Sequence, residues 1–174
     1  MDPLRRRFLK AGLAGAAALA IAGGVAWFRR RIGRAAAAPA LDADARDVVR
    51  AIVPSMLAGA LPEGAARAIA IDETVDGVDH AIAGLLPSAR AELAQLFALL
   101  TSGVGRRAFA GVPSAWREAT RGEVDAFLAS WQESGWALKR TAYDALHQLV
   151  IASWYANPRS WPAIGYPGPP VLGA

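Results

Sequence analysis

The amino-acid sequence predicts an all-α protein: a small helical bundle of about five helices, with an N-terminal signal or anchor helix and an extended C-terminal tail rich in proline, glycine and aromatic residues. Two observations lead to this prediction. Apolar residues recur at intervals of three and four through most of the chain, as they do on the buried face of a helix. No window alternates apolar and polar residues between turn signals, as a strand would.

The first two helices are expected to be amphipathic. The first follows the acidic segment 42–47, and Pro54 ends or kinks it because proline cannot donate the amide hydrogen bond of a helix. The second places acidic residues and His80 away from its apolar face, where we expect a solvated surface. The expected core residues of these helices are Val48, Val49, Ile52, Val53, Ile71, Val75, Val78, Ile82 and Leu85.

The third helix opens at Pro87 and breaks at Ser102, after which we expect a loop over residues 104–119. The fourth begins at a capping box, in which the Thr120 hydroxyl and the Glu123 carboxylate satisfy each other's exposed backbone amides. The expected apolar residues of these two helices are Leu93, Leu96, Phe97, Leu100, Val124, Phe127, Leu128 and Trp131.

The fifth helix is expected over residues 136–155 and stops at Asn157-Pro158. The proline-rich segment after it predicts an extended, polyproline-like path instead of a helix. Its aromatic rings suit docking on the chain's own bundle, on a partner, or on both. The residues that we assign to a partner-binding surface are Trp154, Tyr155, Trp161, Gly165, Tyr166, Pro167, Gly168 and Pro169.

The N-terminus matches the leader of the twin-arginine export route, which has two arginines, any residue, Phe, Leu and often Lys. The matching residues are Arg5, Arg6, Phe8, Leu9 and Lys10. An uncharged, alanine-rich stretch from Ala11 to Phe28 follows, and an A-x-A cleavage site can end at Ala38 or Ala40. We therefore expect residues 1–40 to be a twin-arginine signal peptide, either cleaved or retained as an inner-membrane anchor, and residues 41–174 to form a helical domain in the periplasm.

The positive charge of the chain belongs mainly to this leader. Eight of the 19 basic residues precede Leu41, whereas residues 41–174 carry 11 basic and 14 acidic side chains, a net charge of about −3. A nucleic-acid-binding protein needs a basic face on its folded part. Nucleic acid is therefore not expected as a partner.

Residue types that carry catalysis or bind metals are scarce. The chain has no cysteine and two histidines, neither of them in a zinc-binding pattern, and no Gly-rich loop follows a strand to hold a nucleotide. We assign no catalytic residue, no metal site and no cofactor to this chain. Tyr143, His147, Ile151 and Trp154 share one helical stripe, which indicates a packed histidine, with Tyr143 and His147 as the alternative contacts of a small ligand.

The two ends of the chain together resemble a known family. The helical segment 142–146, the Trp154-Tyr155 pair and, above all, Trp161 followed by Gly165-Tyr166-Pro167-Gly168-Pro169 are similar to the small, leader-bearing subunit of periplasmic flavin dehydrogenases, the gluconate 2-dehydrogenase subunit 3 family. The resemblance covers nearly the whole chain, with its sharp motifs at the two ends.

This resemblance implies a non-catalytic subunit. Its partner would be a large FAD-dependent dehydrogenase subunit of the glucose–methanol–choline class, often joined by a cytochrome c subunit, and the small subunit would carry the large one through the twin-arginine translocase. Some members of the family contain cysteines and this chain has none, so no electron-transfer role is expected for it.

Two other interpretations remain open. The chain can be a free-standing helical ligand-binding protein, periplasmic or membrane-anchored, that uses Tyr143, His147 and Trp154. It can also be an enzyme with a dispersed site, in which case the isolated chain would have an activity that His147→Ala abolishes.

Overall fold

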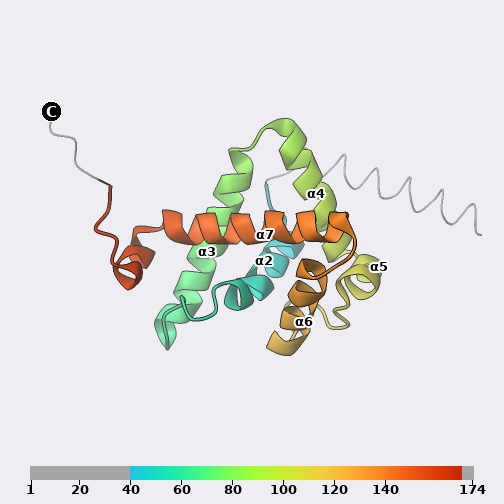
Figure 1. Ribbon diagram of the computed structural model, residues 1–174, viewed down its shortest axis with the longest axis horizontal. Coiled ribbons are helices and arrows are strands. Elements are labelled where there is room, and N and C mark those ends of the chain that lie inside the picture. Colours follow the sequence, from blue (N-terminus) through green and yellow to red (C-terminus); the bar gives the residue numbers. More distant parts are fainter. Residues whose placement is uncertain (1–39, 170–174) are drawn as a thin grey trace, which may run out of the picture.

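The structure, a computed structural model, describes residues 40–169. Five helices of 12 to 20 residues form its body, and this part of the chain contains no strand (Figure 1). They are α2 (Ala43–Met56), α3 (Ala65–Ala83), α4 (Pro87–Thr101), α6 (Arg121–Gln132) and α7 (Ala137–Ala156). The all-α bundle is confirmed. The residues assigned to the leader, up to position 39, lie outside the described residues.

α2 is the central helix and packs against α3, α4, α6 and α7. Its first turn is capped by the Asp42 side chain, which accepts a hydrogen bond from the Ala45 amide at 2.8 Å. Val48, Ile52 and Val53 are fully enclosed, with 0 % of their surface exposed. Because burial of one such side chain stabilises a fold by about 1.5–3 kcal/mol, this stripe is the main reason why the other helices gather around α2.

α7 lies across α3, and the two helices meet at small residues (Figure 1). A methyl group built on Gly77 of α3 would lie 3.0 Å from the Cβ of Ser153 in α7, which is closer than side chains normally approach. Val78 and Val150 are buried beside this crossing. The absence of a side chain at Gly77 therefore sets how closely the two longest helices pack.

The capping box at the start of α6 forms as the sequence predicts. The Thr120 amide donates to the Glu123 carboxylate at 2.7 Å, and the Glu123 amide donates to the Thr120 hydroxyl at 3.3 Å. The Ser114 hydroxyl donates to the same carboxylate at 2.7 Å. The hydrogen bonds from the Thr120 amide and then from the Ser114 hydroxyl lower the pKa of Glu123 below that of an ordinary glutamate, because they favour the charged carboxylate.

Two irregular segments differ from the prediction, and the first is the loop expected over residues 104–119. Its beginning is helical, with a short turn α5 (Gly103–Gly105) followed by a π-helical turn η1 (Arg106–Ala110). The Ser102 hydroxyl accepts a hydrogen bond from the Gly105 amide at 3.0 Å and so starts a new helical turn where the sequence suggested a break. Gly111, with a φ of 72°, ends it.

The second is the tail, which is not extended at its start. Residues Pro158–Ile164 form a 3₁₀ helix, η2. The Asn157 side chain caps this helix, and Pro158 occupies its first turn, where a missing amide hydrogen costs nothing. Gly165, with a φ of 68°, ends it. The prediction of an extended path is therefore wrong for residues 158–164, whereas residues 166–169 have no regular secondary structure.

Pro54 does not end α2 at that position. The proline lies inside α2, and the helix continues past it to Met56. None of the helices between residues 40 and 169 is long and apolar enough to span a membrane.

Candidate interaction surfaces

The tail folds back onto the end of α7 through its aromatic residues. The Trp161 indole N–H donates to the Tyr155 carbonyl at 2.9 Å, and the rings of Trp161 and Tyr166 meet edge to face with centroids 5.2 Å apart. The Tyr166 amide donates to the Trp161 carbonyl at 3.0 Å. Gly168 then passes over the indole, where a Cβ would lie 3.2 Å from the Trp161 ring. Trp161 is thus the residue around which the tail closes.

Polar contacts connect the same region to α3. The Asn157 amide nitrogen donates to one carboxylate oxygen of Glu73 at 2.8 Å, and Arg159 forms an ion pair with the other at 2.8 Å. The tail therefore packs on its own bundle, which was one of the two arrangements that the sequence left open.

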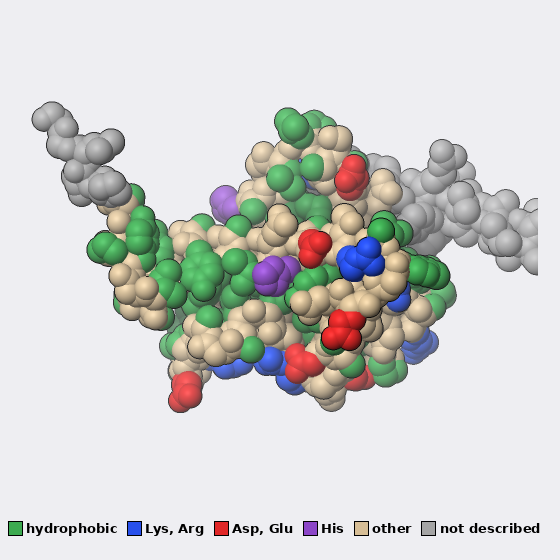
Figure 2. Space-filling view, viewed as in Figure 1, with side chains coloured by type: hydrophobic (Ala, Val, Ile, Leu, Met, Phe, Trp, Pro, Cys, Tyr) green, Lys and Arg blue, Asp and Glu red, His purple; other side chains and the backbone are tan. Residues whose placement is uncertain are grey.

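Part of this region nevertheless faces solvent. Tyr155, Ile164 and Tyr166 are 41 %, 52 % and 44 % exposed, and the neighbouring Pro167 and Pro169 are exposed as well. Figure 2 shows hydrophobic side chains gathered over the tail and the adjoining end of α7. Gly165 and Gly168 shape the turn beneath these side chains. We call the group formed by Tyr155, Ile164 and Tyr166 the tail surface.

Trp154, also assigned to the partner surface from the sequence, lies elsewhere. Its side chain is 5 % exposed and belongs to the hydrophobic core. It supports the end of α7 from inside and is not part of the tail surface.

In the stripe proposed for a small ligand, two aromatic rings stack on each other. The rings of Tyr143 and His147 stack with centroids 5.7 Å apart and planes 19° from parallel. Both residues and Ile151 are half-buried, and they pack side by side along α7. Neither Tyr143 nor His147 lines the groove described next. His80 is exposed, on the solvated face where the sequence placed it.

A groove of about 850 Å³ lies between the end of α3, α4 and α7, and its lining is mostly apolar. The connection between α3 and α4 reaches it through Leu85, α4 through Leu96 and Leu99, and η1 through Phe109. Trp136, Leu138 and Phe109 line it while remaining 67 %, 78 % and 44 % exposed. Single exposed apolar residues are ordinary, as Leu86 and Val104 are here, but apolar residues exposed around one groove commonly mark an interaction site. We call this feature the α4–α7 groove.

The lining residues repeat with a regular spacing on both helices. On α7 they include Leu138, Ala142, Ala145, Leu149 and Ala152. On α4 they include Ala89, Glu92, Leu96 and Leu99. Steps of three and four residues keep such a stripe on one side of a helix. The stripe on α7 adjoins the buried face formed by residues such as Leu146 and Val150, so the apolar arc of α7 is broader than its buried part.

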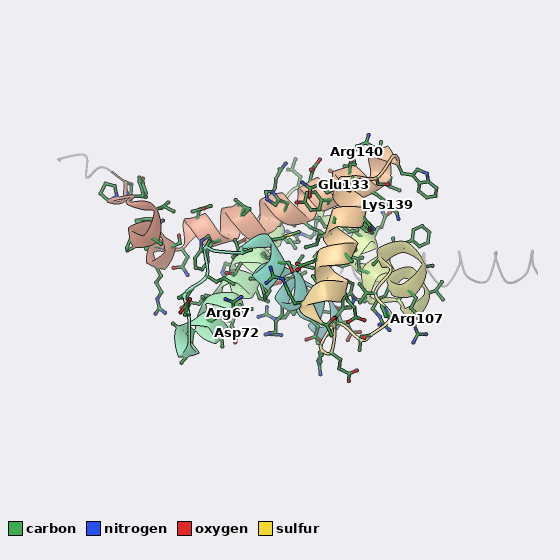
Figure 3. The ribbon with its side chains drawn as sticks, turned by 60° about the horizontal axis from the view of Figure 1, so that its bottom comes forward. Arg67, Asp72, Arg107, Glu133, Lys139 and Arg140 are labelled. Atoms are coloured by element: carbon green, nitrogen blue, oxygen red, sulfur yellow. The ribbon has the colours of Figure 1, made fainter. Side chains whose placement is uncertain are left out.

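Two charged residues also line the groove. Lys139 stands at the start of α7, with its ammonium 6.0 Å from the centre of the Trp136 ring, and Glu92 comes from α4. Figure 3 shows Lys139 beside Arg140 at that end of α7, close to Glu133 at the end of α6. Among the described residues, neither Lys139 nor Glu92 forms a salt bridge.

The acidic residues of α3 form ion pairs with two arginines of α2. Arg46 of α2 pairs with Asp76 and lies 3.6 Å from Asp79, and Arg50 pairs with Asp72 at 2.8 Å. Asp79 also accepts the Leu41 amide at 2.8 Å. These contacts join α2 to α3 at the surface, where single ion pairs contribute little stability.

Arg117 extends this network through Asp47. The hydrogen bond to Asp47, together with its charge, raises the pKa of Arg117 further above its already high value. Within residues 40–169 no group of three His, Asp or Glu side chains is placed to hold a metal ion.

Sequence reasoning missed the α4–α7 groove. The sequence identifies Trp136 only as the start of a helix and places Phe109 in the expected loop, although both are large apolar residues next to polar segments. The sequence carries only a partial signal of the groove, an apolar arc on α7 that is broader than one buried face needs. A comparison with protein-family models finds no match to this chain, and comparisons with curated proteins and with solved structures find none either.

Proposed function

We propose that this chain is the non-catalytic small subunit of a periplasmic FAD-dependent dehydrogenase of the glucose–methanol–choline type that acts on an alcohol or a sugar. In this proposal it escorts the folded catalytic subunit through the twin-arginine translocase and stabilises the complex afterwards. The chain itself holds no cofactor, and FAD is bound by the partner. A cytochrome c subunit is a further candidate member of the complex.

The observation that carries the proposal is the amount of large apolar surface left exposed. The described part of the chain exposes Phe109, Trp136 and Leu138 at the groove, and a second set of apolar side chains at the tail surface. Such surfaces typically mark sites of protein interaction. Aromatic residues are enriched at the centres of interfaces, where they contribute much of the binding energy.

The leader supports the escort role for a physical reason. A flavoprotein folds around its FAD in the cytoplasm, so it needs a route that exports folded proteins. A partner that carries Arg5, Arg6, Phe8, Leu9 and Lys10 supplies one signal for the whole complex. This requires that the two chains bind tightly before export, which agrees with a small subunit that exposes two apolar surfaces.

The proposal is tested by purifying the full chain, tagged at its C-terminus, from the periplasmic and membrane fractions of its native host. We expect a second protein to co-purify in a fixed ratio and to show the absorbance spectrum of FAD. A colourless chain that elutes alone from both fractions would refute the proposal.

One observation favours a second candidate, a helical ligand-binding protein. The groove volume of about 850 Å³ falls within the range typical of small-molecule sites, about 300–1,000 Å³, and such sites are mostly apolar. In this case the ligand would occupy the α4–α7 groove instead of the Tyr143 and His147 stripe. Saturable binding of a fluorescent fatty acid to a stable monomer, abolished by Ala145→Trp, would favour this candidate over the escort subunit.

A further inference from the structure

We infer that the folded bundle closes the Ala40–Leu41 bond to signal peptidase, so that the leader is removed at the Ala37–Ala38 bond and the exported chain begins at Ala38. This inference rests on the leader and the export route of the proposed function, and it adds to them the position of the cut. The twin-arginine route exports folded proteins, so the peptidase meets a domain whose helices have already formed. Whether a bond can be cut then depends on how the fold holds the backbone around it.

The sequence before the bundle contains three overlapping A-x-A sites, which end at Ala37, Ala38 and Ala40. All three satisfy the requirement for a small residue at the first and the third position of the site. They differ in the residue that follows the cut and in the distance of the cut from Leu41, the first core residue of the described chain. These two differences decide which of the three bonds is cut.

Contacts on both sides hold the Ala40–Leu41 bond in place. Ala40 is half-buried and packs against the hydrophobic core, and Leu41 belongs to that core with 4 % of its surface exposed. The Leu41 amide, which is the nitrogen of this bond, donates to the Asp79 carboxylate of α3 at 2.8 Å. The next residue, Asp42, caps the first turn of α2 with its side chain. The site that ends at Ala40 is therefore built into the start of the bundle.

A peptidase binds the residues around a scissile bond in an extended form and pairs with their backbone hydrogen-bonding groups. At the Ala40–Leu41 bond, this binding requires that the Leu41 side chain leaves the core and that its amide leaves Asp79. Both contacts connect the start of the described chain to the helices around it, so the bond becomes available only when this region unfolds locally. The folded domain therefore protects this bond.

The bond after Ala38 is excluded by its chemistry. The residue that follows it is Pro39, whose nitrogen is a tertiary amide that has no N–H and carries the proline ring beside the scissile bond. The Ala37–Ala38 bond has neither obstacle, because it joins two alanines and residues 38–40 separate it from Leu41. Its hydrolysis adds the hydroxyl of a water molecule to the Ala37 carbonyl carbon and a proton to the Ala38 nitrogen.

The first residue of the exported chain tests the inference directly. The full chain, tagged at its C-terminus, is purified from the periplasmic and membrane fractions of its native host, and its N-terminus is identified by intact-mass measurement and N-terminal sequencing. We expect the chain to begin at Ala38. A chain that begins at Pro39 or Leu41, or one that keeps the whole leader, would overturn the inference.

Two variants distinguish protection by the fold from a preference of the peptidase for one sequence. Ala37→Tyr places a large side chain where the first site needs a small one, and it leaves the other two A-x-A sites intact. We expect this variant to keep its leader, because the two remaining bonds stay closed. Asp79→Ala, added to Ala37→Tyr, removes the acceptor of the Leu41 amide. We expect the fraction of exported chains that begins at Leu41 to rise at least tenfold.

The matched control adds Asp76→Ala to Ala37→Tyr. Asp76 pairs with the same Arg46 as Asp79, whereas Asp79 is the acceptor of the Leu41 amide. The control should therefore keep its leader. Efficient cleavage of Ala37→Tyr alone at Leu41 would show that the fold does not protect this bond, and the inference would fail.

The same purification separates this inference from the proposed function. If the wild-type chain begins at Leu41 and the flavoprotein still co-purifies with it, the inference fails while the proposed function stands. If the wild-type chain stays in the cytoplasm with its leader, the escort function and the inference fail together.

Discussion

Trp161 holds the C-terminal tail in place with one hydrogen bond and one ring contact. Its indole reaches the Tyr155 carbonyl, its ring meets Tyr166, and Gly168 leaves just enough room for the chain to pass over it. Few other apolar contacts tie the tail down, because Ile164 and Tyr166 remain exposed. The stability of the tail is therefore local, and it depends on Trp161 together with the contacts of Asn157 and Arg159 to Glu73.

Trp161→Ala should release the tail without unfolding the bundle. A loss of about one to two kcal/mol of local stability corresponds to roughly a 5–30-fold higher population of the open tail. Limited trypsin digestion measures it, because Arg159 lies within the tail: we expect cleavage there to accelerate by that factor. Trp136→Ala, which removes an exposed indole outside the tail, is the control and should leave the rate unchanged. A large fall in melting temperature for Trp161→Ala would contradict this view.

Glu123 gives a prediction that depends on pH. Its folded-state pKa is lowered by hydrogen bonds, so its contribution to stability is present above the pKa of the unfolded chain and is lost as the pH falls through the lower pKa of the folded protein. Glu123→Gln should therefore be less stable than the wild type at neutral pH, and the difference should disappear in acid. Urea unfolding at several pH values measures this. Ser114→Ala should raise the Glu123 pKa, as followed by carboxyl-carbon NMR, and an unchanged pKa would contradict the assignment.

At the scale of the helices, close packing between α3 and α7 depends on Gly77. A larger side chain there would meet Ser153 at 3.0 Å or less, so Gly77→Leu should destabilise the protein by about 1–3 kcal/mol through overpacking. Gly122 of α6 has no neighbour within 4 Å of a built Cβ. Gly122→Ala should therefore be neutral or stabilise by up to about 1 kcal/mol. Urea unfolding of both variants decides the point, and a neutral Gly77→Leu would mean that the helices can separate at no cost.

Most helices could be predicted from the sequence because local signals and burial agree in them. In α6 the capping box starts the helix, and Val124, Phe127, Leu128 and Trp131 are all buried as expected. The mispredicted segments are those in which one capping side chain starts a short helix. Ser102 caps the turn α5 where the sequence predicts a loop, and Asn157 caps η2 where the sequence predicts an extended tail. Such caps act on one or two residues and carry no periodic pattern.

The α4–α7 groove could not be predicted for a different reason. Its existence depends on the distance between two helices that the sequence shows only as separate amphipathic segments. Leu96 is expected on the apolar face of its helix, and the structure leaves it only half-buried at the edge of the groove. Tertiary packing, which decides whether a second apolar stripe is covered, has no local signature.

The whole molecule combines three features that the escort proposal relates to one another. The described bundle holds itself together without metal ligands or cysteines, through the enclosed stripe of α2 and the α3–α7 crossing. It leaves the groove and the tail surface exposed, both rich in the residues that dominate binding energies. The third feature is the leader predicted from the sequence at residues 1–40, whose export route would accept folded complexes. If a flavoprotein binds this chain before export, each of the three features has a role in the proposed complex.

The most direct test of this proposal follows the flavoprotein instead of the small chain. The native host is grown with either the wild-type chain or a variant in which Arg5 and Arg6 are both replaced by Lys, and FAD-containing protein that binds the tagged chain is quantified in cytoplasmic and periplasmic fractions. We predict that the flavoprotein reaches the periplasm with the wild type and stays in the cytoplasm, bound to the chain, with the variant. A flavoprotein that reaches the periplasm equally in both strains would contradict the escort function.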